Sequence, residues 1–374
     1  MSKPVKHICI PVINDLATDQ RVLRIARYWH NKGYRVHLYG RVLKNSLPMP
    51  DLPFDYTRRK HFFHSGPFFY AEYSIRLFFF LCRHASGLIW ANDLDTLPAS
   101  ALVRTLKKNI TLIYDAHEYF TEVPELQRNP FAKKVWTLFE KICLPKADYF
   151  FTVNQSIADV YTKKYKKPFH VLRNMPYRLV KTDLPGLEKL GLPADKKRII
   201  LQGSGINVDR GAEEAVEAMA LLSDAYTLII AGSGDVLPLL KRKVKTLGME
   251  QKVLFFDRMP YLQLMEYTRS CDLGLSLDKD TNLNYRLALP NKIFDYIQAE
   301  IPVLVSDLPE LSRIVDGFEV GVKIKDLNPN ALAEAIEFVF ENEERYKQWK
   351  KNTAYAAEIL CRENEEKVLD ILPL

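Results

Sequence analysis

The chain has 374 residues with an ordinary globular composition, 47% hydrophobic and 26% charged, which is enough for two domains and excludes a low-complexity polypeptide. Its five cysteines are odd in number and widely spaced, which argues against a disulfide framework or a zinc site and fits a reducing cytoplasm. The net charge of +7 is uneven: residues 1–173 carry 27 Lys and Arg against 14 Asp and Glu, and residues 174–374 carry 26 against 32. We therefore expect the first half to face something anionic.

The first half alternates short apolar runs with helical patterns. Residues 1–6 lead directly into a strand at His7–Val12, so we expect no signal peptide. A helix follows at Asp19–His30, with Val22 and Ile25 on an apolar face and Arg21, Arg24 and Arg27 on the other. Strands separated by helices predict a parallel, doubly wound sheet that binds ligands beyond the carboxyl ends of its strands. The further strands are expected at Tyr34–Gly40, Gly87–Ala91, Thr111–Asp115 and Tyr149–Val153.

Polar side chains follow several of these strands, where ligands of such a sheet bind. Between the two carboxylates that follow the third strand, Asp93 is a better candidate for contact with an acceptor than Asp95. The loop from residue 14 to residue 21 could close over an acceptor or contact a diphosphate. The acceptor-binding candidates are Asn14, Asp15, Asp93 and Glu118.

An unusually aromatic segment spans residues 61–83. Nine of the residues from 61 to 80 are Phe or Tyr, but Gly66, Pro67, Glu72 and Arg76 interrupt the run, so it cannot be a spanning helix. Basic residues flank the segment on both sides. Two interpretations remain open: a helix that lies in a membrane interface, or a buried helix that covers the first sheet.

The second half begins after a segment that is rich in proline and glycine and has no sustained periodicity. We expect an N-terminal domain at 1–174, a linker at 175–197 and a second strand–helix array from Ile199 to about Ile324 within a domain at 198–345. Two helices follow, at Ala331–Phe340 and Tyr346–Leu369.

The segment Leu289–Gln298 predicts a phosphate site. Pro290 is typical of a first helical turn, so a helix is expected to open there with unpaired N–H groups and the positive end of its dipole. Lys292 adds a cation, and Asp295, one turn in, is placed to reach ribose hydroxyls. An ordinary helix–strand unit is the alternative interpretation.

Four ordered matches give this chain a resemblance to the GT-B glycosyltransferases, in particular the retaining family 4 group. The segment just described is similar to the family's Pro-x-Lys helix followed by an apolar strand and Ser-Asp. The other matches are the loop Gln202–Gly211 with Arg210 before its last glycine, the strand end Ile229–Gly234, and the strand Val253–Arg258. The resemblance implies an α/β fold of two Rossmann-like, doubly wound domains with a cleft between them. It also implies that residues 346–374 cross back to the first domain.

The resemblance also assigns roles to residues. It implies catalytic roles for His117, Arg210 and Lys292, with His117 as a neutral imidazole beside the donor sugar. Two positions depart from the family pattern, because Ser204 replaces an arginine and Leu287 replaces a glutamate. Donor-binding roles are implied for Gly203, Arg210, Gly232, Arg258, Pro290, Asn291, Lys292 and Asp295.

The implied activity is the transfer of a hexose from a nucleotide diphosphate sugar to a glycan or lipid-linked acceptor in cell-envelope polysaccharide synthesis. Configuration would be retained, without a metal or another cofactor. A cytoplasmic protein is expected, with peripheral contact to the anionic inner face of the cell membrane and no nucleic-acid partner. The alternatives are a nucleotide-sugar 2-epimerase of the same fold and a non-catalytic partner subunit with a degraded donor site.

Overall fold

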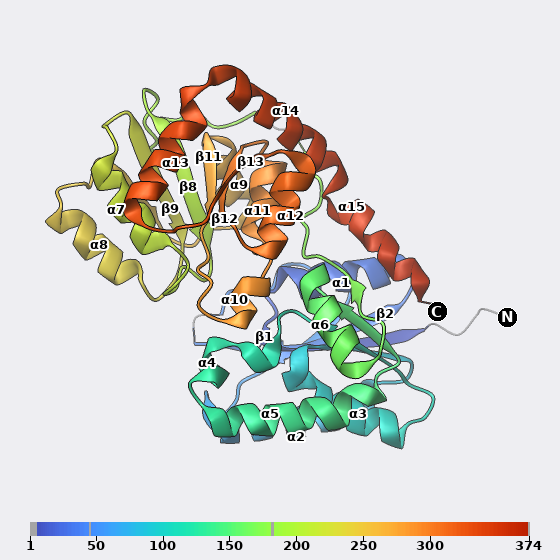
Figure 1. Ribbon diagram of the computed structural model, residues 1–374. Coiled ribbons are helices and arrows are strands. Elements are labelled where there is room, and N and C mark those ends of the chain that lie inside the picture. Colours follow the sequence, from blue (N-terminus) through green and yellow to red (C-terminus); the bar gives the residue numbers. More distant parts are fainter. Residues whose placement is uncertain (1–5, 45, 181–182, 373–374) are drawn as a thin grey trace. The chain divides into compact units, whose positions relative to one another are not determined.

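The computed structural model describes residues 6–44, 46–180 and 183–372, and the chain divides into two compact units, residues 1–173 and 174–374 (Figure 1). The described ranges leave out residues 1–5, which precede the predicted first strand. They also leave out two residues of the predicted linker at 175–197. Both units are Rossmann-like domains built from a parallel sheet with helices on its two faces. This architecture confirms the predicted fold class.

The first unit contains a seven-stranded parallel sheet in the order β3-β2-β1-β4-β5-β6-β7. The order reverses at β1, so the carboxyl ends of β1 and β4 flank a topological switch point, where doubly wound sheets bind ligands. The strands are β1 (His7–Asp15), β2 (Arg35–Arg41), β3 (Asp55–Arg59), β4 (Leu88–Asn92), β5 (Thr111–Ala116), β6 (Tyr149–Thr152) and β7 (His170–Val171).

Helices cover both faces of this sheet. In Figure 1, α1 and α6 lie on one face, and α2, α3 and α5 form a layer on the other. Asp19 begins α1 by accepting a hydrogen bond from the backbone N–H of Val22, which satisfies one of the free donors of the first turn. The helical segments are α1 (Gln20–Asn31), α2 (Gly66–His84), α3 (Asp93–Leu106), η1 (Phe120–Glu122), α4 (Pro124–Gln127), α5 (Pro130–Cys143), η2 (Leu144–Lys146) and α6 (Gln155–Tyr165).

The aromatic segment 61–83 forms α2, and its two faces differ. Phe69, Tyr73 and Leu77 are buried against the sheet, as the core-helix interpretation expected. Phe68 and Phe79, on the opposite face, are largely exposed. The segment is therefore a sheet-covering helix that also presents aromatic side chains outward.

The second unit contains a six-stranded parallel sheet in the order β10-β9-β8-β11-β12-β13, which reverses at β8. The strands are β8 (Lys197–Gly203), β9 (Tyr226–Gly232), β10 (Val253–Phe256), β11 (Leu273–Ser276), β12 (Val303–Ser306) and β13 (Gly321–Ile324). The helical segments are α7 (Ala212–Leu221), α8 (Leu237–Thr246), α9 (Tyr261–Arg269), α10 (Leu283–Leu287), α11 (Lys292–Gln298), α12 (Pro309–Phe318), α13 (Pro329–Glu341), α14 (Glu343–Ile359), α15 (Arg362–Glu365) and η3 (Glu366–Ile371).

Two hydrophobic cores lie on the two faces of this sheet. One packs α7, α8 and α13 against the strands, and the other packs α9, α11, α12 and α14 (Figure 1). Tyr296 fastens α11 to the second face: its hydroxyl donates to the carbonyl of Leu275 at 3.0 Å and accepts from the N–H of Gln202 at 3.2 Å. A side chain at Gly274 would collide with the Tyr296 ring, so glycine permits this close packing. The helix is thereby held beside the ends of β8 and β11.

Three expectations differ from the structure. The sequence did not predict β3, whose residues are polar and mostly exposed at the sheet edge, so no apolar run marks it. The helix expected to open at Pro290 begins at Lys292, because residues 290 and 291 form a preceding turn. The predicted helix Tyr346–Leu369 is interrupted at Leu360, between α14 and α15. The return of residues 346–374 to the first domain stays a prediction.

Candidate active site

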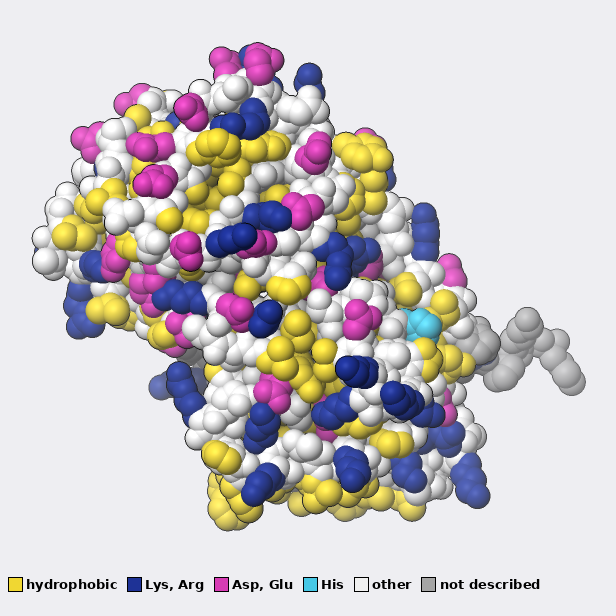
Figure 2. Space-filling model, in the orientation of Figure 1, with side chains coloured by type: hydrophobic (Ala, Val, Ile, Leu, Met, Phe, Trp, Pro, Cys, Tyr) yellow, Lys and Arg dark blue, Asp and Glu magenta, His cyan; other side chains and the backbone are white. Residues whose placement is uncertain are grey.

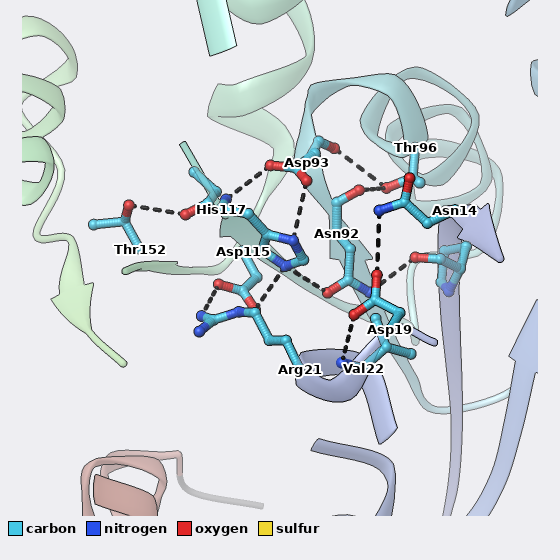
Figure 3. Close-up of polar contacts among 12 residues, drawn as sticks. Asn14, Asp19, Arg21, Val22, Asn92, Asp93, Thr96, Asp115, His117 and Thr152 are labelled. Atoms are coloured by element: carbon cyan, nitrogen blue, oxygen red, sulfur yellow. Dashed lines mark hydrogen bonds and ion pairs between the residues drawn. The ribbon is translucent and has the colours of Figure 1, made fainter. Parts of the chain in front are cut away.

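A charged cluster around His117 lies at the carboxyl ends of β4 and β5 in the first unit (Figure 3). His117 directly follows β5, and Asp93 directly follows β4, so the parallel pairing of these two neighbouring strands brings the two residues together. The imidazole Nδ1 lies 3.1 Å from a carboxylate oxygen of Asp93, and the backbone N–H of His117 donates to the other oxygen at 2.7 Å. Asp93 has a positive φ of 58°, a backbone conformation that is uncommon outside glycine and that occurs more often at functional sites.

The other ring nitrogen of His117 faces two acceptors. Nε2 lies 3.1 Å from the side-chain oxygen of Asn92 and 3.5 Å from a carboxylate oxygen of Asp115. Burial alone would lower the pKa of His117, but the carboxylates of Asp93 and Asp115 outweigh it and raise that pKa to about 10. The ring is therefore an imidazolium at neutral pH. Both ring nitrogens face acceptors, which favours the imidazolium over the neutral imidazole that the resemblance implied.

Asp115 is anchored by an ion pair that is almost entirely buried. The guanidinium of Arg21 donates to both carboxylate oxygens, at 3.0 and 2.5 Å, and the indole N–H of Trp90 donates to one of them at 3.0 Å. Arg21 also donates to the carbonyl of Leu172. Burial opposes ionisation of Asp115, but Arg21 and His117 hold the pKa of the carboxyl well below its usual range. The sequence placed Arg21 and Arg24 on the polar face of α1, and both are buried instead.

The remaining acceptor candidates lie near this edge but differ in exposure. Asn14 is exposed and donates to Asp19, and Glu118 is half-buried. Asp15 is buried, and it accepts from Arg58 at 2.7 Å. Asp95 is also buried, and burial together with Asp93 raises its pKa well above the ordinary value. Among these carboxylates, Asp93 and Glu118 are the better placed to meet a ligand.

In the second unit, Arg210 pairs with a buried carboxylate. Arg210 ends the loop after β8, and its guanidinium donates to Asp278, which follows β11, at 2.5 Å. The same guanidinium lies over the ring of Tyr285, 4.0 Å from its centroid. Gly211 has a φ of 75°, and a side chain there would collide with Leu277, so glycine is required where this loop enters α7. Buried nitrogen Nε of Arg210 and the second oxygen of Asp278 have no hydrogen-bond partner in the described structure.

Lys292 is the second cation of this cluster. It is the first residue of α11, and the electrostatic field of Asp278 and Arg210 acts on its ammonium. Burial lowers the pKa of Lys292, Asp278 opposes that shift, and Arg210 adds to it. The structure gives Lys292 no hydrogen bond or ion pair within the described ranges. Arg210 therefore contacts Asp278, and Lys292 lies within electrostatic range of both, so two cations share one buried carboxylate and leave an excess positive charge.

Asp295 lies one turn further along α11. Its carboxylate accepts from the side chain of Gln202 at 3.2 Å and from the hydroxyl of Tyr261 at 2.9 Å. Gln202 is itself buried at the end of β8 and accepts from Thr268. The carboxylate proposed for ribose contact is thus oriented by neighbouring side chains, at the same edge of the sheet as Arg210.

The other donor-site candidates fall on the loops of the second unit. Gly203 and Gly232 end neighbouring strands with φ of 151° and 139°, and a side chain at Gly232 would collide with the carbonyl of Gly203. Pro290 and Asn291 form the turn before Lys292, and Arg258 is exposed after β10. These positions stay predictions for donor contact.

The structure pairs Arg210 with Asp278, a residue that the sequence analysis did not single out, and Lys292 lies within electrostatic range of this pair. One signal pointed to it: Asp278 follows an apolar strand, as Asp93 follows β4. In the described parts of the chain no three His, Cys, Asp or Glu side chains gather as a metal site would require. No described helix is both long and apolar enough to span a bilayer.

Two family models match the chain, and both describe glycosyltransferases. The model of glycosyl transferases group 1 matches residues 188–355, and the model of glycosyltransferase family 4 matches residues 19–175. Each match covers most of one unit. The two Rossmann-like domains are those of a GT-B glycosyltransferase. The chain belongs to the glycosyl transferases of group 1.

Individual relatives share the whole length of the chain at low identity. The chitobiosyldiphosphodolichol beta-mannosyltransferase of Candida glabrata is 22% identical over 418 residues, with 99% of this chain and 91% of the relative covered. WaaG, a glycosyltransferase involved in lipopolysaccharide biosynthesis, has a TM-score of 0.74 at 18% identity, covering 96% of this chain and 99% of that chain. Anabaena HepE in complex with UDP-glucose has a TM-score of 0.74 at 15% identity, covering 98% and 100%. The solved structures at these identities share the fold.

Proposed function

We propose that this glycosyltransferase moves a hexose from a nucleotide diphosphate sugar to a glycan or lipid-linked acceptor, with retention of configuration, in cell-envelope polysaccharide synthesis. The observation that carries the proposal is the ion pair of Arg210 with the buried Asp278, together with Lys292, whose ammonium lies within electrostatic range of both. Negative charge develops on the leaving diphosphate during transfer, and cations fixed before the reaction stabilise it.

The donor would lie at the carboxyl end of the second sheet. Lys292 and the partly exposed guanidinium of Arg210 would hold the diphosphate, and Asp295 would accept from the ribose. Anabaena HepE, which has the same fold, was crystallised with UDP-glucose, and this supports a nucleotide-sugar donor. The base and the sugar are left open by these contacts.

The acceptor would contact the edge of the first sheet, near Asp93 and Glu118. The Candida relative is named for an acceptor that carries a diphosphate and a dolichol, and WaaG acts in lipopolysaccharide biosynthesis. Both names favour a lipid-linked glycan as the acceptor here. A cytoplasmic enzyme at the inner membrane face would meet such an acceptor.

His117 would act as a fixed cation in this reaction. Its two ring nitrogens already donate to Asp93 and to the Asn92–Asp115 side, so the imidazolium has no lone pair with which to accept a proton. We propose that the leaving phosphate accepts the acceptor's proton on the same face of the sugar, which retains configuration. Metal-free transfer fits the same scheme, because Arg210 and Lys292 would supply the positive charge.

One observation supports inversion as the rival outcome. The Candida relative is named a beta-mannosyltransferase, and Asp93 is a strand-end carboxylate that could serve as a general base.

A panel of nucleotide sugars is first screened for thermal stabilisation of the protein, which identifies the donor. NMR of the early transfer product then reports the anomer directly. Retention in the presence of EDTA supports the proposal, and an inverted product or complete loss of activity in EDTA contradicts it.

A further inference from the structure

The layer formed by α2, α3 and α5 presents an apolar outer surface. Contacts of α3 with both other helices, and an edge-to-face contact of Tyr70 with Trp136 at 5.0 Å, show that the three helices pack side by side. Figure 2 shows hydrophobic side chains along the lower edge of the molecule, where Figure 1 draws α2 and α5. The outer apolar surface, as named here, comprises Phe68, Ile75 and Phe79 of α2, Leu102 and Leu106 of α3, and Phe131, Leu138 and Ile142 of α5.

These residues form regular stripes along their helices. The exposed large apolar side chains of α2 are at positions 68, 75 and 79, and those of α5 are at 131, 138, 139 and 142, so both helices contain the spacing of seven and four residues. This is the spacing of one helical face. Phe131 is 76% exposed and Phe79 is 66% exposed, values far from those of a core residue. Large contiguous apolar patches on monomeric soluble proteins commonly mark interaction sites.

The solvent-exposed charged residues of these three helices are all basic. The acidic side chains of the three helices are buried or largely so, since Glu72 is 11% exposed and paired with Arg76, and Glu140 is fully buried. Asp93 and Asp95 are turned into the candidate active site. The exposed basic residues on these helices are Arg83, Lys134 and Lys141. Long basic side chains beside apolar ones can lay their stems along an apolar phase and keep their charges at its boundary.

A basic depression adjoins one end of the outer apolar surface. It lies where α3 and α5 end and is lined by Arg104, Lys108, Lys146 and Lys167, together with Asp148. Arg104 already pairs with Asp148, so the three lysines exceed the carboxylates that line it. The depression therefore suits an anionic group next to an apolar phase.

We propose that the outer apolar surface docks on the surface of a bilayer rich in anionic lipid. Membrane-surface binding needs apolar side chains and basic side chains, and this surface has both. The apolar side chains would enter the boundary of the acyl chains, and the lysines would pair with headgroup phosphates. A second copy of the chain would bring like charges together at this face. The inference is independent of the donor site, because no residue of the second unit takes part.

The test measures sedimentation of the full-length protein with vesicles of phosphatidylcholine alone or with one third phosphatidylglycerol. Phe79→Ser with Phe131→Ser removes two exposed aromatics from two helices, and Leu239→Ser with Leu262→Ser is the control pair, exposed on the second unit. Lys134→Glu with Lys141→Glu reverses two exposed charges, and Lys350→Glu with Lys351→Glu is its control on α14. Thermal melts and nucleotide binding of every variant check that the protein is folded.

We expect the wild-type protein to bind the anionic vesicles and to be released as salt rises. The aromatic pair and the charge pair should each weaken that binding at least about tenfold, with melting temperature and nucleotide binding unchanged, and the controls should bind like wild type. Absence of wild-type binding to anionic vesicles at low salt would overturn the proposal. So would equal losses in test and control pairs, or a dimer in solution that the Phe79/Phe131 variant abolishes while vesicle binding persists. Failure of the wild-type protein to bind any nucleotide would instead count against the proposed donor site and would leave the result with vesicles unaffected.

Discussion

The two charged clusters of the molecule differ in how their charges are balanced. In the first unit, Arg21 and His117 face Asp115 and Asp93, so two cations meet two carboxylates and each has a partner. In the second unit, Arg210 and Lys292 face Asp278 alone. A balanced, buried cluster fixes geometry, whereas an excess cation retains the capacity to bind an anion. We therefore propose positioning for the first cluster and diphosphate binding for the second.

The largest expected effect comes from breaking the balanced cluster. Arg21→Ala leaves Asp115 as a buried charge without its main partner, which should cost about 3–5 kcal/mol of unfolding free energy. Urea denaturation followed by tryptophan fluorescence measures this well, because Trp29, Trp90 and Trp136 lie in the first unit. Arg27→Ala, on the same helix but only half-buried, is the control and should change stability by less than about 0.5 kcal/mol. Equal stability of the two variants would show that the Arg21–Asp115 pair is not structural.

Removal of Arg210 should lower stability less than removal of Arg21 does, and it should also weaken ligand binding. Arg210→Ala removes the proposed phosphate contact and also leaves Asp278 without its partner, so we expect a loss of about 1.5–3 kcal/mol in unfolding free energy as well as weaker diphosphate binding. Adding Asp278→Asn should recover part of the stability but not the binding. If the double variant is no more stable than Arg210→Ala, the buried charge of Asp278 is not the cause of the loss.

The stability supplied by His117 should depend on pH. Its folded-state pKa of about 10 is raised above the ordinary value of 6.5, so its contribution is full below about pH 6.5 and is lost as pH rises toward 10. The unfolding free energy of wild type minus that of His117→Gln should be about 1.5–3 kcal/mol at pH 6 and should shrink steadily up to pH 10. A difference that is constant with pH, or grows, would mean that the imidazole is neutral in the folded protein.

The sequence predicted the apolar strands β1, β2, β4, β5 and β6 of the first sheet, because buried parallel strands are continuous hydrophobic runs. In the second sheet it did not place β11 or β13 individually. It did not predict β3, an edge strand of polar residues. Lys292 and Asp295 were found from the helix start near Pro290, and Arg210 was found through the family resemblance. The charge balance around them was not predicted, since Asp278 comes from a different strand. Periodicity likewise placed Arg21 on the outside of α1, because a helical pattern cannot distinguish a solvated arginine from one that reaches a buried carboxylate.

The charge of His117 shows a similar limit. Asp115 lies two residues before it, so one carboxylate was visible in the sequence, but Asp93 arrives from the neighbouring strand. Only the pairing of β4 with β5 places both carboxylates around the ring. Residues that act together across strands were therefore accessible only from the fold.

The excess positive charge of the second cluster is tested most directly at Lys292. Calorimetry of the full-length protein compares a nucleoside diphosphate that stabilises it with the matching nucleoside, for wild type, Lys292→Ala and the exposed control Arg286→Ala. We predict that Lys292→Ala weakens diphosphate binding by about 1.5–3 kcal/mol, roughly 10- to 150-fold in Kd, and leaves nucleoside binding and Arg286→Ala unchanged. Unchanged diphosphate affinity in Lys292→Ala, or equal losses for the diphosphate and the nucleoside, would contradict the account.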